Sequence, residues 1–406
     1  PEETNMKIRS VTGFVTIGNS ETQEKTVQAT GRLVGQARAA LEAAGLEVQT
    51  TRLATQPLSL LPGDPLALAA ELWPLCARAG FEYLSLGPVL ADAQDADLSR
   101  LDLIPDLVRT TESVFATVLV ARRGGGLNLE AIRRTARLVR DIAHRTDLGF
   151  GNLRLAMLAN VGPMAPLFPA ASHDGGPPAV GVATESADLA VAALGEAGSL
   201  HEVRQRLVAA VEAGAGQIEA ALRPLAQKHG YRFTGIDLSW APFPEEARSI
   251  GAAVERLGVD RFGVPGTLFA ASFLTDCLRR ADYTRCGFNG LMLPVLEDGT
   301  LAGRSLDNLF SVNDLLLYSA VCGTGLDTVP LPGEVSEEEL AGILLDVAAL
   351  ALRLDKPLTA RLMPVPGAKA GDLTEFDFAY FANGRVLDTK GRSCRGLFER
   401  GGWLAD

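Results

Sequence analysis

The chain has 406 residues, with 38 Lys or Arg against 49 Asp or Glu, so its formal charge is −11. An acidic chain lacks the clustered cations that binding to a phosphate backbone requires, so we expect no nucleic-acid partner. A hydrophobic fraction of 47% with a charged fraction of 21% is typical of globular proteins and argues against a disordered or fibrous chain.

Short apolar strands alternate with amphipathic helices in the first part of the chain. We predict strands at residues 8–17, 46–53, 81–86 and 114–121, and helices at 21–44, 66–78 and 128–145. Asn128 is placed to cap the last of these helices, and Gly87-Pro88 to end the third strand. This alternation predicts a mainly parallel sheet with helices packed against it.

The same alternation continues through the middle of the chain. We predict strands at 153–160 and 179–183, a loop at 161–178 and a helix at 186–194. Ser199 and Glu202 have the spacing of a capping box, which opens a long helix that ends near Gly230. No low-complexity linker divides the chain, so we expect one α/β domain over residues 1–406, with a peripheral tail from about 389.

No stretch of the sequence is apolar enough to predict a membrane span. The most apolar window, residues 343–354, is interrupted by Asp346 and Arg353, whereas a span needs about 20 apolar residues. Residues 1–9 do not resemble a signal peptide, and the five scattered cysteines form no CxxC pair. We therefore expect a cytoplasmic protein without a membrane partner, and its apolar helices favour a homo-oligomer.

A weak internal repeat singles out two aspartates. Residues 235–237 (Gly-Ile-Asp) and 325–327 (Gly-Leu-Asp) are each followed by a proline-rich loop, a Glu-Glu pair and a helix. Active sites of α/β folds lie at the carboxyl ends of strands, so Asp237 and Asp327 could divide acid and base roles or bind a divalent metal ion. The alternatives are that the repeat is coincidental and that each Asp caps its loop through backbone N–H groups.

Two further residues are candidates for catalysis. His173 lies in a Gly- and Pro-rich loop beside Asp174 and could shuttle a proton or bind a metal ion; the alternative is a hydrogen bond within the loop. Cys322 follows the apolar run 315–321, and a thiol there could act as a nucleophile if its pKa were lowered. The alternative is a buried, inert cysteine.

Other charged and polar side chains are candidates for substrate binding. Arg361 and Lys369 flank the stiff segment 364–367 and could clamp a carboxylate or phosphate, although solvated charges are the alternative. Further candidates, which could equally be turn or helix-cap residues, are Glu185, Ser239, Asn308 and Asn313. The chain has no P-loop, HExxH or GxSxG motif, which sets those enzyme families aside.

Segment 317–333, LYSAVCGTGLDTVPLPG, resembles the hallmark of an uncharacterised family known as domain of unknown function 711 or uncharacterised protein family 0210. The resemblance runs from residue 7 to about 388. It implies a ten-stranded pyruvate formate-lyase-like α/β barrel of two parallel half-sheets, in whose radical enzymes a central loop presents a cysteine that Cys322 would match. Segments 383–387 and 394–397 do not fit the glycyl-radical motif of those enzymes, so we expect no radical formation within this chain.

Together these features predict an enzyme of unknown substrate with a polar site inside an α/β barrel. Acid–base or metal-assisted chemistry of the hydrolase or lyase type would act on a small anionic metabolite. The alternatives are an enzyme that depends on Cys322 and a non-catalytic small-molecule binding or sensor protein, because fold alone does not specify function.

Overall fold

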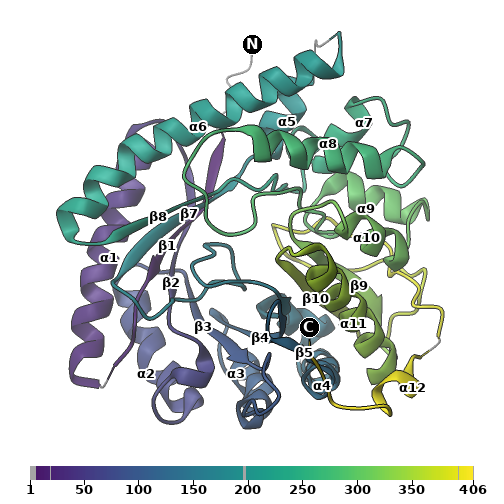
Figure 1. Cartoon of the computed structure of the whole chain (residues 1–406), viewed down its shortest axis with the longest axis horizontal. Helices are drawn as coiled ribbons and strands as arrows, with labels where there is room; N and C mark the ends of the chain where they lie inside the picture. The colour runs from purple at the N-terminus through teal and green to yellow at the C-terminus, as the bar shows by residue number, and fades with distance from the viewer. Residues whose placement is uncertain (1–5, 19, 195–197, 392, 406) are drawn as a thin grey trace.

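The strands of the computed structural model form one curved sheet, and helices lie around its outer side (Figure 1). The structure describes residues 6–18, 20–194, 198–391 and 393–405. Along the sheet the strands follow the order β8 (Arg232–Asp237), β7 (Ala179–Glu185), β1 (Lys7–Phe14), β2 (Val48–Ala54), β3 (Tyr83–Leu90), β4 (Val114–Arg122), β6 (Leu155–Ala159), β10 (Leu358–Val365) and β9 (Gly325–Pro332). Beside this path, β5 (Gly126–Asn128) pairs with β4 and with β11 (Trp403–Ala405).

The strand directions bring two kinds of strand end to one edge of the sheet. The neighbours from β1 to β6 along the path are parallel, as are β7 with β8 and β9 with β10. β7 runs antiparallel to β1, so that Glu185 faces Lys7, and β10 runs antiparallel to β6, so that Leu358 faces Ala159. The amino ends of β1–β4 therefore share an edge with the carboxyl ends of β7 and β10. The predicted α/β class with a mostly parallel sheet is confirmed.

The path of the sheet is open between β8 and β9. Segment 285–294 lies between these strands and joins both of them through isolated bridges. The bridged pairs are Ile236 with Arg285, Trp240 with Leu291 and Asp327 with Pro294. The strands thus form no continuous closed ladder in the described part of the chain.

Helices alternate with strands in the first part of the chain, whereas α7 to α10 follow one another between β8 and β9. The helices are α1 (Ser20–Ala43), α2 (Pro65–Arg78), α3 (Ile104–Thr110), α4 (Leu129–Arg145), α5 (Ala187–Ala193), α6 (Leu200–His229), α7 (Ile250–Arg256), α8 (Thr267–Arg280), α9 (Gly299–Leu306), α10 (Val312–Ser319), α11 (Glu337–Leu354) and α12 (Arg395–Phe398). Asn128 caps α4, and Ser199 with Glu202 forms the predicted capping box of α6, which ends at the left-handed Gly230. Among the described residues, no helix is long and apolar enough to cross a membrane.

The predicted end of the third strand at Gly87 is wrong. β3 continues to Leu90, and its register with β4 shifts between Ser85 and Pro88. Gly87 has a φ of 70°, and a Cβ there would lie 2.9 Å from the carbonyl oxygen of Gln56. Glycine therefore permits a bulge in the strand, and a bulge also tolerates a proline that lacks an N–H group.

The internal repeat maps onto two strands that flank segment 285–294. Gly235 in β8 and Gly325 in β9 both have positive φ, 123° and 98°. A Cβ at Gly235 would overlap the carbonyl oxygen of Thr284, and one at Gly325 would overlap that of Thr359. The repeated glycines are therefore required by the close approach of neighbouring backbone.

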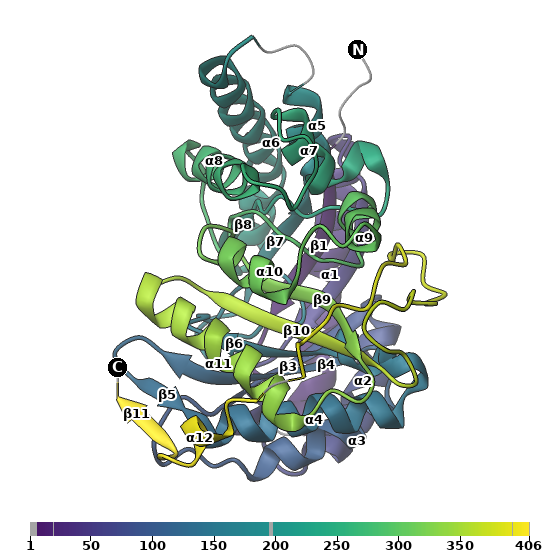
Figure 2. The same ribbon diagram turned by 90° about the vertical axis from the view of Figure 1, so that its right-hand side faces the viewer.

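Two long connections extend to the edge where the strand ends meet. Segment 161–178, between β6 and β7, crosses the inner side of the sheet (Figure 1), where Thr12 Oγ1 donates to Pro166 O at 2.9 Å. The segment after β10 folds back along β9 (Figure 2), and Leu387 N donates to Pro330 O at 2.9 Å. Both connections contribute side chains to the pocket described next.

Candidate functional site

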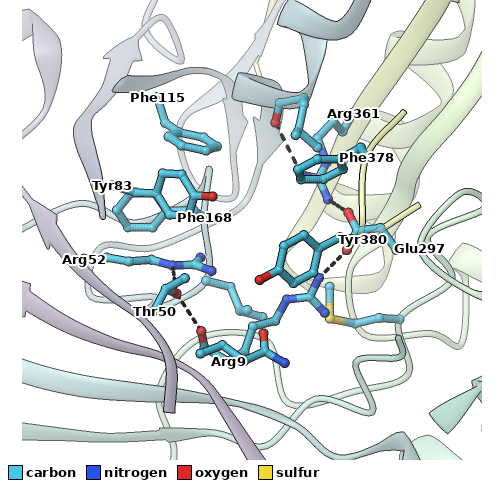
Figure 3. Close-up of a pocket in the computed structure, with 14 residues that line it drawn as sticks. Arg9, Thr50, Arg52, Tyr83, Phe115, Phe168, Glu297, Arg361, Phe378 and Tyr380 are labelled. Atoms are coloured by element: carbon cyan, nitrogen blue, oxygen red, sulfur yellow. Dashed lines mark hydrogen bonds and ion pairs between the residues drawn. The ribbon is translucent and has the colours of Figure 1, made fainter. Parts of the chain in front are cut away.

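A pocket lies at the edge of the sheet where the amino ends of β1–β4 meet β10 (Figure 3). Its cavity volume is about 80 Å³, which is below the range of drug-sized ligand sites, so a ligand held there must be small. Arg9, Arg52, Arg361 and Glu297 line its polar side. Because the pocket combines several charges with partial burial, we take it as the candidate site.

Arg361 is the centre of a buried ion network. Its Nε donates to Asp327 Oδ1 at 2.6 Å, and its Nη2 donates to Glu297 Oε1 at 2.7 Å. Its Nη1 lies 3.3 Å from the carbonyl oxygen of Leu153. Glu297 Oε2 also accepts a hydrogen bond from Arg9 Nη2. Every side-chain nitrogen of Arg361 is therefore paired, and Glu297 joins two arginines.

The two carboxyl groups of this network have opposite pKa shifts. Burial raises the pKa of Glu297, but the positive charges of Arg361 and Arg9 outweigh it and hold that pKa below its ordinary value. Burial also raises the pKa of Asp327, and the negative charge of Glu297 raises it further. Arg361 lowers it, but not enough, so the pKa of Asp327 stays above its ordinary value. Neighbouring carboxyl groups whose pKa values are pushed apart are a feature of acid–base sites.

Arg52 faces the pocket without a carboxylate partner. Its Nε donates to Thr50 Oγ1 at 2.9 Å, and its Cζ lies 5.5 Å and 5.1 Å from the ring centroids of Tyr83 and Phe168. Within the described residues, no carboxylate forms an ion pair with Arg52, and no group accepts a hydrogen bond from its Nη atoms. Burial lowers the pKa of Arg52 to about 10, and Arg9 acts in the same direction, so Arg52 stays positive at neutral pH.

Aromatic rings form much of the remaining wall of the pocket. Tyr83, Phe115 and Phe168 make a chain of edge contacts, with centroids 5.3 Å apart in each pair. The ring centroids of Phe378 and Tyr380 lie 5.2 Å apart. Figure 3 shows Tyr83 and Phe168 near Arg52, and Phe378 and Tyr380 on the side of Arg361 and Glu297. Such walls suit a ligand with an apolar, flat body.

A second, smaller space of about 20 Å³, the lobe, lies beside the pocket toward β6 and β10 and has room for about one water-sized group. The residues that line both spaces, and so mark their junction, are Leu167, Phe168, Met292 and Arg361. The polar edge of the lobe contains Asp327, Thr324 and Thr359. Thr324 Oγ1 is buried and has no hydrogen-bond partner within the described ranges.

Of the two aspartates in the internal repeat, only Asp327 lines this space. Asp237 is fully buried at the end of β8, where its Oδ1 accepts from Ser239 Oγ at 2.6 Å and from Asn289 N at 3.1 Å. Its Oδ2 accepts from Phe288 N at 2.7 Å. The predicted site residues Asp237 and Ser239 thus hold residues 288–290 against the end of β8. Burial raises the pKa of Asp237 despite these hydrogen bonds.

The predicted metal ligands are engaged by hydrogen-bond donors. Asp237 accepts from backbone N–H groups and a hydroxyl, and Asp327 accepts from Arg361. In the part of the chain that the structure describes, no group of three or more His, Cys, Asp and Glu side chains is arranged to hold a metal ion.

His173 and Cys322 are fully buried and lie outside the lining of the pocket. His173 Nδ1 lies 3.0 Å from Thr16 Oγ1, its Nε2 lies 3.3 Å from Pro177 O, and burial lowers its pKa. Cys322 Sγ accepts a hydrogen bond from Gly325 N at 3.3 Å. These contacts agree with a loop hydrogen bond and a buried thiol, and a catalytic role for either residue stays a prediction.

The remaining predicted binding residues are spread over the molecule. Glu185 is buried and accepts hydrogen bonds from Arg248 and from Gln49, which itself lines the pocket. Lys369, Asn308 and Asn313 are exposed and line neither the pocket nor its lobe. The structure therefore brings Arg361 and Asp327 together, whereas Glu185 is linked to the pocket only through its hydrogen bond with Gln49.

Sequence reasoning missed Arg9, Arg52, Glu297 and the aromatic walls. These residues come from separate strands and loops, which only the pairing of the sheet brings together. A usable signal was present in two strands, because Arg9 and Arg52 lie in segments whose other residues are mostly apolar or β-branched. A charged side chain within such a strand needs a partner or a ligand.

The burial of Cys322 leads to a testable expectation. In the native protein, alkylation of Cys322 by iodoacetamide should be at least about 100-fold slower than in urea, because the thiol is reached only when the core opens. Peptide mass spectrometry over time measures the rate for each cysteine, and the partly exposed Cys394 serves as the internal comparison. Equal rates in the native and unfolded protein would show that the Cys322 thiol is accessible in the native fold and could act as a nucleophile.

Comparison with known proteins extends over nearly the whole chain. Residues 2–382 match a family model described as Uncharacterised ACR (DUF711). The chain is 32% identical to a UPF0210 protein of Pyrobaculum arsenaticum, over 84% of this chain and 78% of that one. It is 31% identical to a UPF0210 protein of Methanopyrus kandleri, over 87% and 82%, and 29% identical to one of Desulforudis audaxviator, over 92% and 89%.

Proposed function

This chain belongs to the uncharacterised family DUF711, and from that premise we propose that it is an enzyme that binds a small organic anion and acts on it by acid–base chemistry. Arg52 would bind the anionic group, the aromatic walls would hold the body of the ligand, and the carboxyl pair on Arg361 would transfer protons. The reaction would be of the hydrolase or lyase type.

The unpaired guanidinium of Arg52 is the observation that carries this proposal. At the pocket three arginines face two carboxyl groups, and Arg52 is the arginine whose Nη atoms have no acceptor in the described chain. A buried cation without a partner is unfavourable, so a ligand that supplies the missing negative charge would stabilise the site. The planar fork of an arginine suits a carboxylate or a phosphate, which can accept two parallel hydrogen bonds.

The carboxyl pair beside Arg52 supports acid–base chemistry. Glu297, held ionised by two arginines, would act as the base or stabilise positive charge, and Asp327, whose raised pKa makes it the easier of the two to protonate, would carry the exchanged proton. Both contact Arg361, which lies at the junction of the pocket and its lobe. A substrate that spans this junction would therefore meet both groups.

We also propose that the sheet is a pyruvate formate-lyase-like barrel with one interrupted strand. The arrangement of β1, β2, β3, β4 and β6 as one parallel half supports this view, because β7 and β10 run antiparallel to its two edges. Segment 285–294 bridges β8 and β9, where a fifth strand of the second half would lie. The bound anion would then sit at one mouth of the barrel.

A non-catalytic small-molecule binding protein is the second candidate. One observation favours it: Glu297 and Asp327 are both engaged by arginines, so neither is a free base. Such a protein would bind anions without converting them. Conversion of any compound in a mixture of small organic acids, lost on Asp327→Asn, would favour the enzyme over the binding protein.

Substitution of Arg52 tests the proposal through ligand binding. We expect benzoate or phenyl phosphate to bind the wild type and raise its melting temperature, and Arg52→Met to weaken that binding about 10- to 100-fold, since charge-assisted hydrogen bonds are lost. Isothermal titration calorimetry measures the affinities. Benzamide, which has the same ring without the charge, should bind both proteins equally weakly.

The folding of the variant provides the control for this experiment. Because Arg52 is buried without an ion partner, Arg52→Met should be as stable as the wild type or more stable. Arg109→Met removes an exposed arginine of α3 and should leave benzoate binding unchanged. If Arg52→Met binds benzoate and phenyl phosphate as well as the wild type does, the anion site is elsewhere.

A further inference from the structure

We propose that the ligand held by Arg52 carries an uncharged hydroxyl group that enters the inner lobe and hydrogen-bonds to Thr324. The substrate class is then a small hydroxy-substituted organic acid with an apolar body. This inference rests on the proposed function and names the substrate class of the same site.

Thr324 presents a hydrogen-bonding group that the protein leaves unused. Its side chain is 3% exposed, its Oγ1 has no partner among the described residues, and it lines the lobe. Buried hydroxyl groups are nearly always hydrogen-bonded, because an unmade bond is costly in a site that excludes water. A ligand hydroxyl can donate and accept, so it satisfies Thr324 in either orientation.

The other polar groups of the lobe already have partners. Thr359 Oγ1 donates to the carbonyl oxygen of Thr324 at 3.1 Å. Arg361 uses its Nε on Asp327 and its Nη2 on Glu297. A second anionic group on the ligand would therefore meet the carboxyl group of Asp327 and no free cation in the lobe. An uncharged hydroxyl group avoids this repulsion, whereas a second carboxylate would be rejected.

Three of the four side chains that line both the pocket and the lobe are apolar. Leu167, Phe168 and Met292 line both the pocket and the lobe, so a ligand that reaches from one polar end to the other passes these side chains. Such a passage favours a flat or aliphatic body over a polar chain such as a sugar. The site thus selects one negative charge, an apolar body and one neutral hydroxyl group.

Two pairs of probe anions test this inference at two different lengths. The pairs are benzoate with 4-hydroxybenzoate, and 3-phenylpropanoate with 3-(4-hydroxyphenyl)propanoate. Calorimetry on the wild type should show that the hydroxyl group lowers Kd about five- to tenfold in at least one pair. In Thr324→Val, which keeps the shape of the side chain, that gain should disappear because valine offers no partner.

Two measurements keep the outcome interpretable. Thr324→Val removes an unpartnered hydroxyl, so its melting temperature should equal or exceed that of the wild type. Thr135→Val alters a buried threonine of α4 whose hydroxyl bonds to Ala131 within the same helix, and it should keep the hydroxyl gain.

The results separate this inference from the proposal on which it rests. If benzoate and 3-phenylpropanoate bind through Arg52 but the hydroxyl group adds nothing in either pair, the inference fails and the anion site stands. The inference also fails if the hydroxyl gain survives in Thr324→Val. If no probe anion binds the wild type, both the inference and the anion site fail.

Discussion

Arg361→Met is expected to lower the free energy of unfolding at pH 7 by about 3–5 kcal/mol, the usual cost of removing one partner from a buried ion pair. Arg361 is 7% exposed and holds Asp327 and Glu297, which are each 5% exposed. Methionine fills a similar volume but supplies no charge, so two carboxyl groups would lose their shared counter-ion. Urea denaturation followed by circular dichroism measures the change.

The pH dependence of this loss identifies its cause. In the wild type the pKa of Glu297 lies below its ordinary value, so Glu297 stabilises the fold above its unfolded pKa of about 4.3, and this contribution is lost as pH falls through the folded pKa. In Arg361→Met, Glu297 would keep Arg9 as its counter-ion, whereas Asp327 would lose the arginine that opposes the rise of its pKa. Protonation of Asp327 would therefore reduce the destabilisation of the variant in acid. The difference from the wild type should therefore be largest near pH 7 and smallest near pH 4.

Two comparison variants complete this test. Arg133→Met removes an exposed arginine that pairs with Glu130 on the same helix, and it should change stability little. The double variant Arg361→Met with Asp327→Asn removes one stranded charge and should be more stable than Arg361→Met alone. A stability of Arg361→Met equal to that of the wild type would show that the network contributes nothing to folding.

The helices and strands were largely predictable because their signals are local. Asn128 and the Ser199–Glu202 box mark helix starts through side-chain hydrogen bonds that involve residues only three positions apart. The end of β3 was missed because Gly87-Pro88 normally indicates a turn, and the bulge that accommodates it depends on the neighbouring strand. A local pattern cannot reveal which backbone lies beside it.

The site was only partly predictable because it assembles residues that are far apart in sequence. Arg361 and Asp327 lie on neighbouring strands, and sequence reasoning had selected both. Arg9 and Arg52 lie on β1 and β2, which are not neighbours of β9 or β10 in the sheet, and Glu297 lies in a loop, so only the curvature of the whole sheet brings them to Arg361. The internal repeat directed attention to the aspartates, whereas the structure shows that its glycines have the common role.

Asp237→Ala is the second substitution for which a large loss of stability is expected. It should lower the free energy of unfolding by about 2–4 kcal/mol. The carboxylate of Asp237 accepts hydrogen bonds from Ser239 Oγ and from the backbone N–H groups of Ser239, Asn289 and Phe288. Alanine would leave these donors without an acceptor beside a fully buried strand end. Urea denaturation at pH 7 again measures the loss.

Ligand binding then separates a structural role for Asp237 from a role in the site. If Asp237 only holds segment 287–290 against β8, folded Asp237→Ala should bind benzoate with the affinity of the wild type, because the carboxylate does not line the pocket. Asp102→Ala, an exposed aspartate paired with Arg134, should change neither stability nor binding appreciably. Unchanged stability together with lost benzoate binding would instead place Asp237 in the functional site, as the internal repeat first suggested. The two outcomes differ in both measurements, so a single set of titrations decides between them.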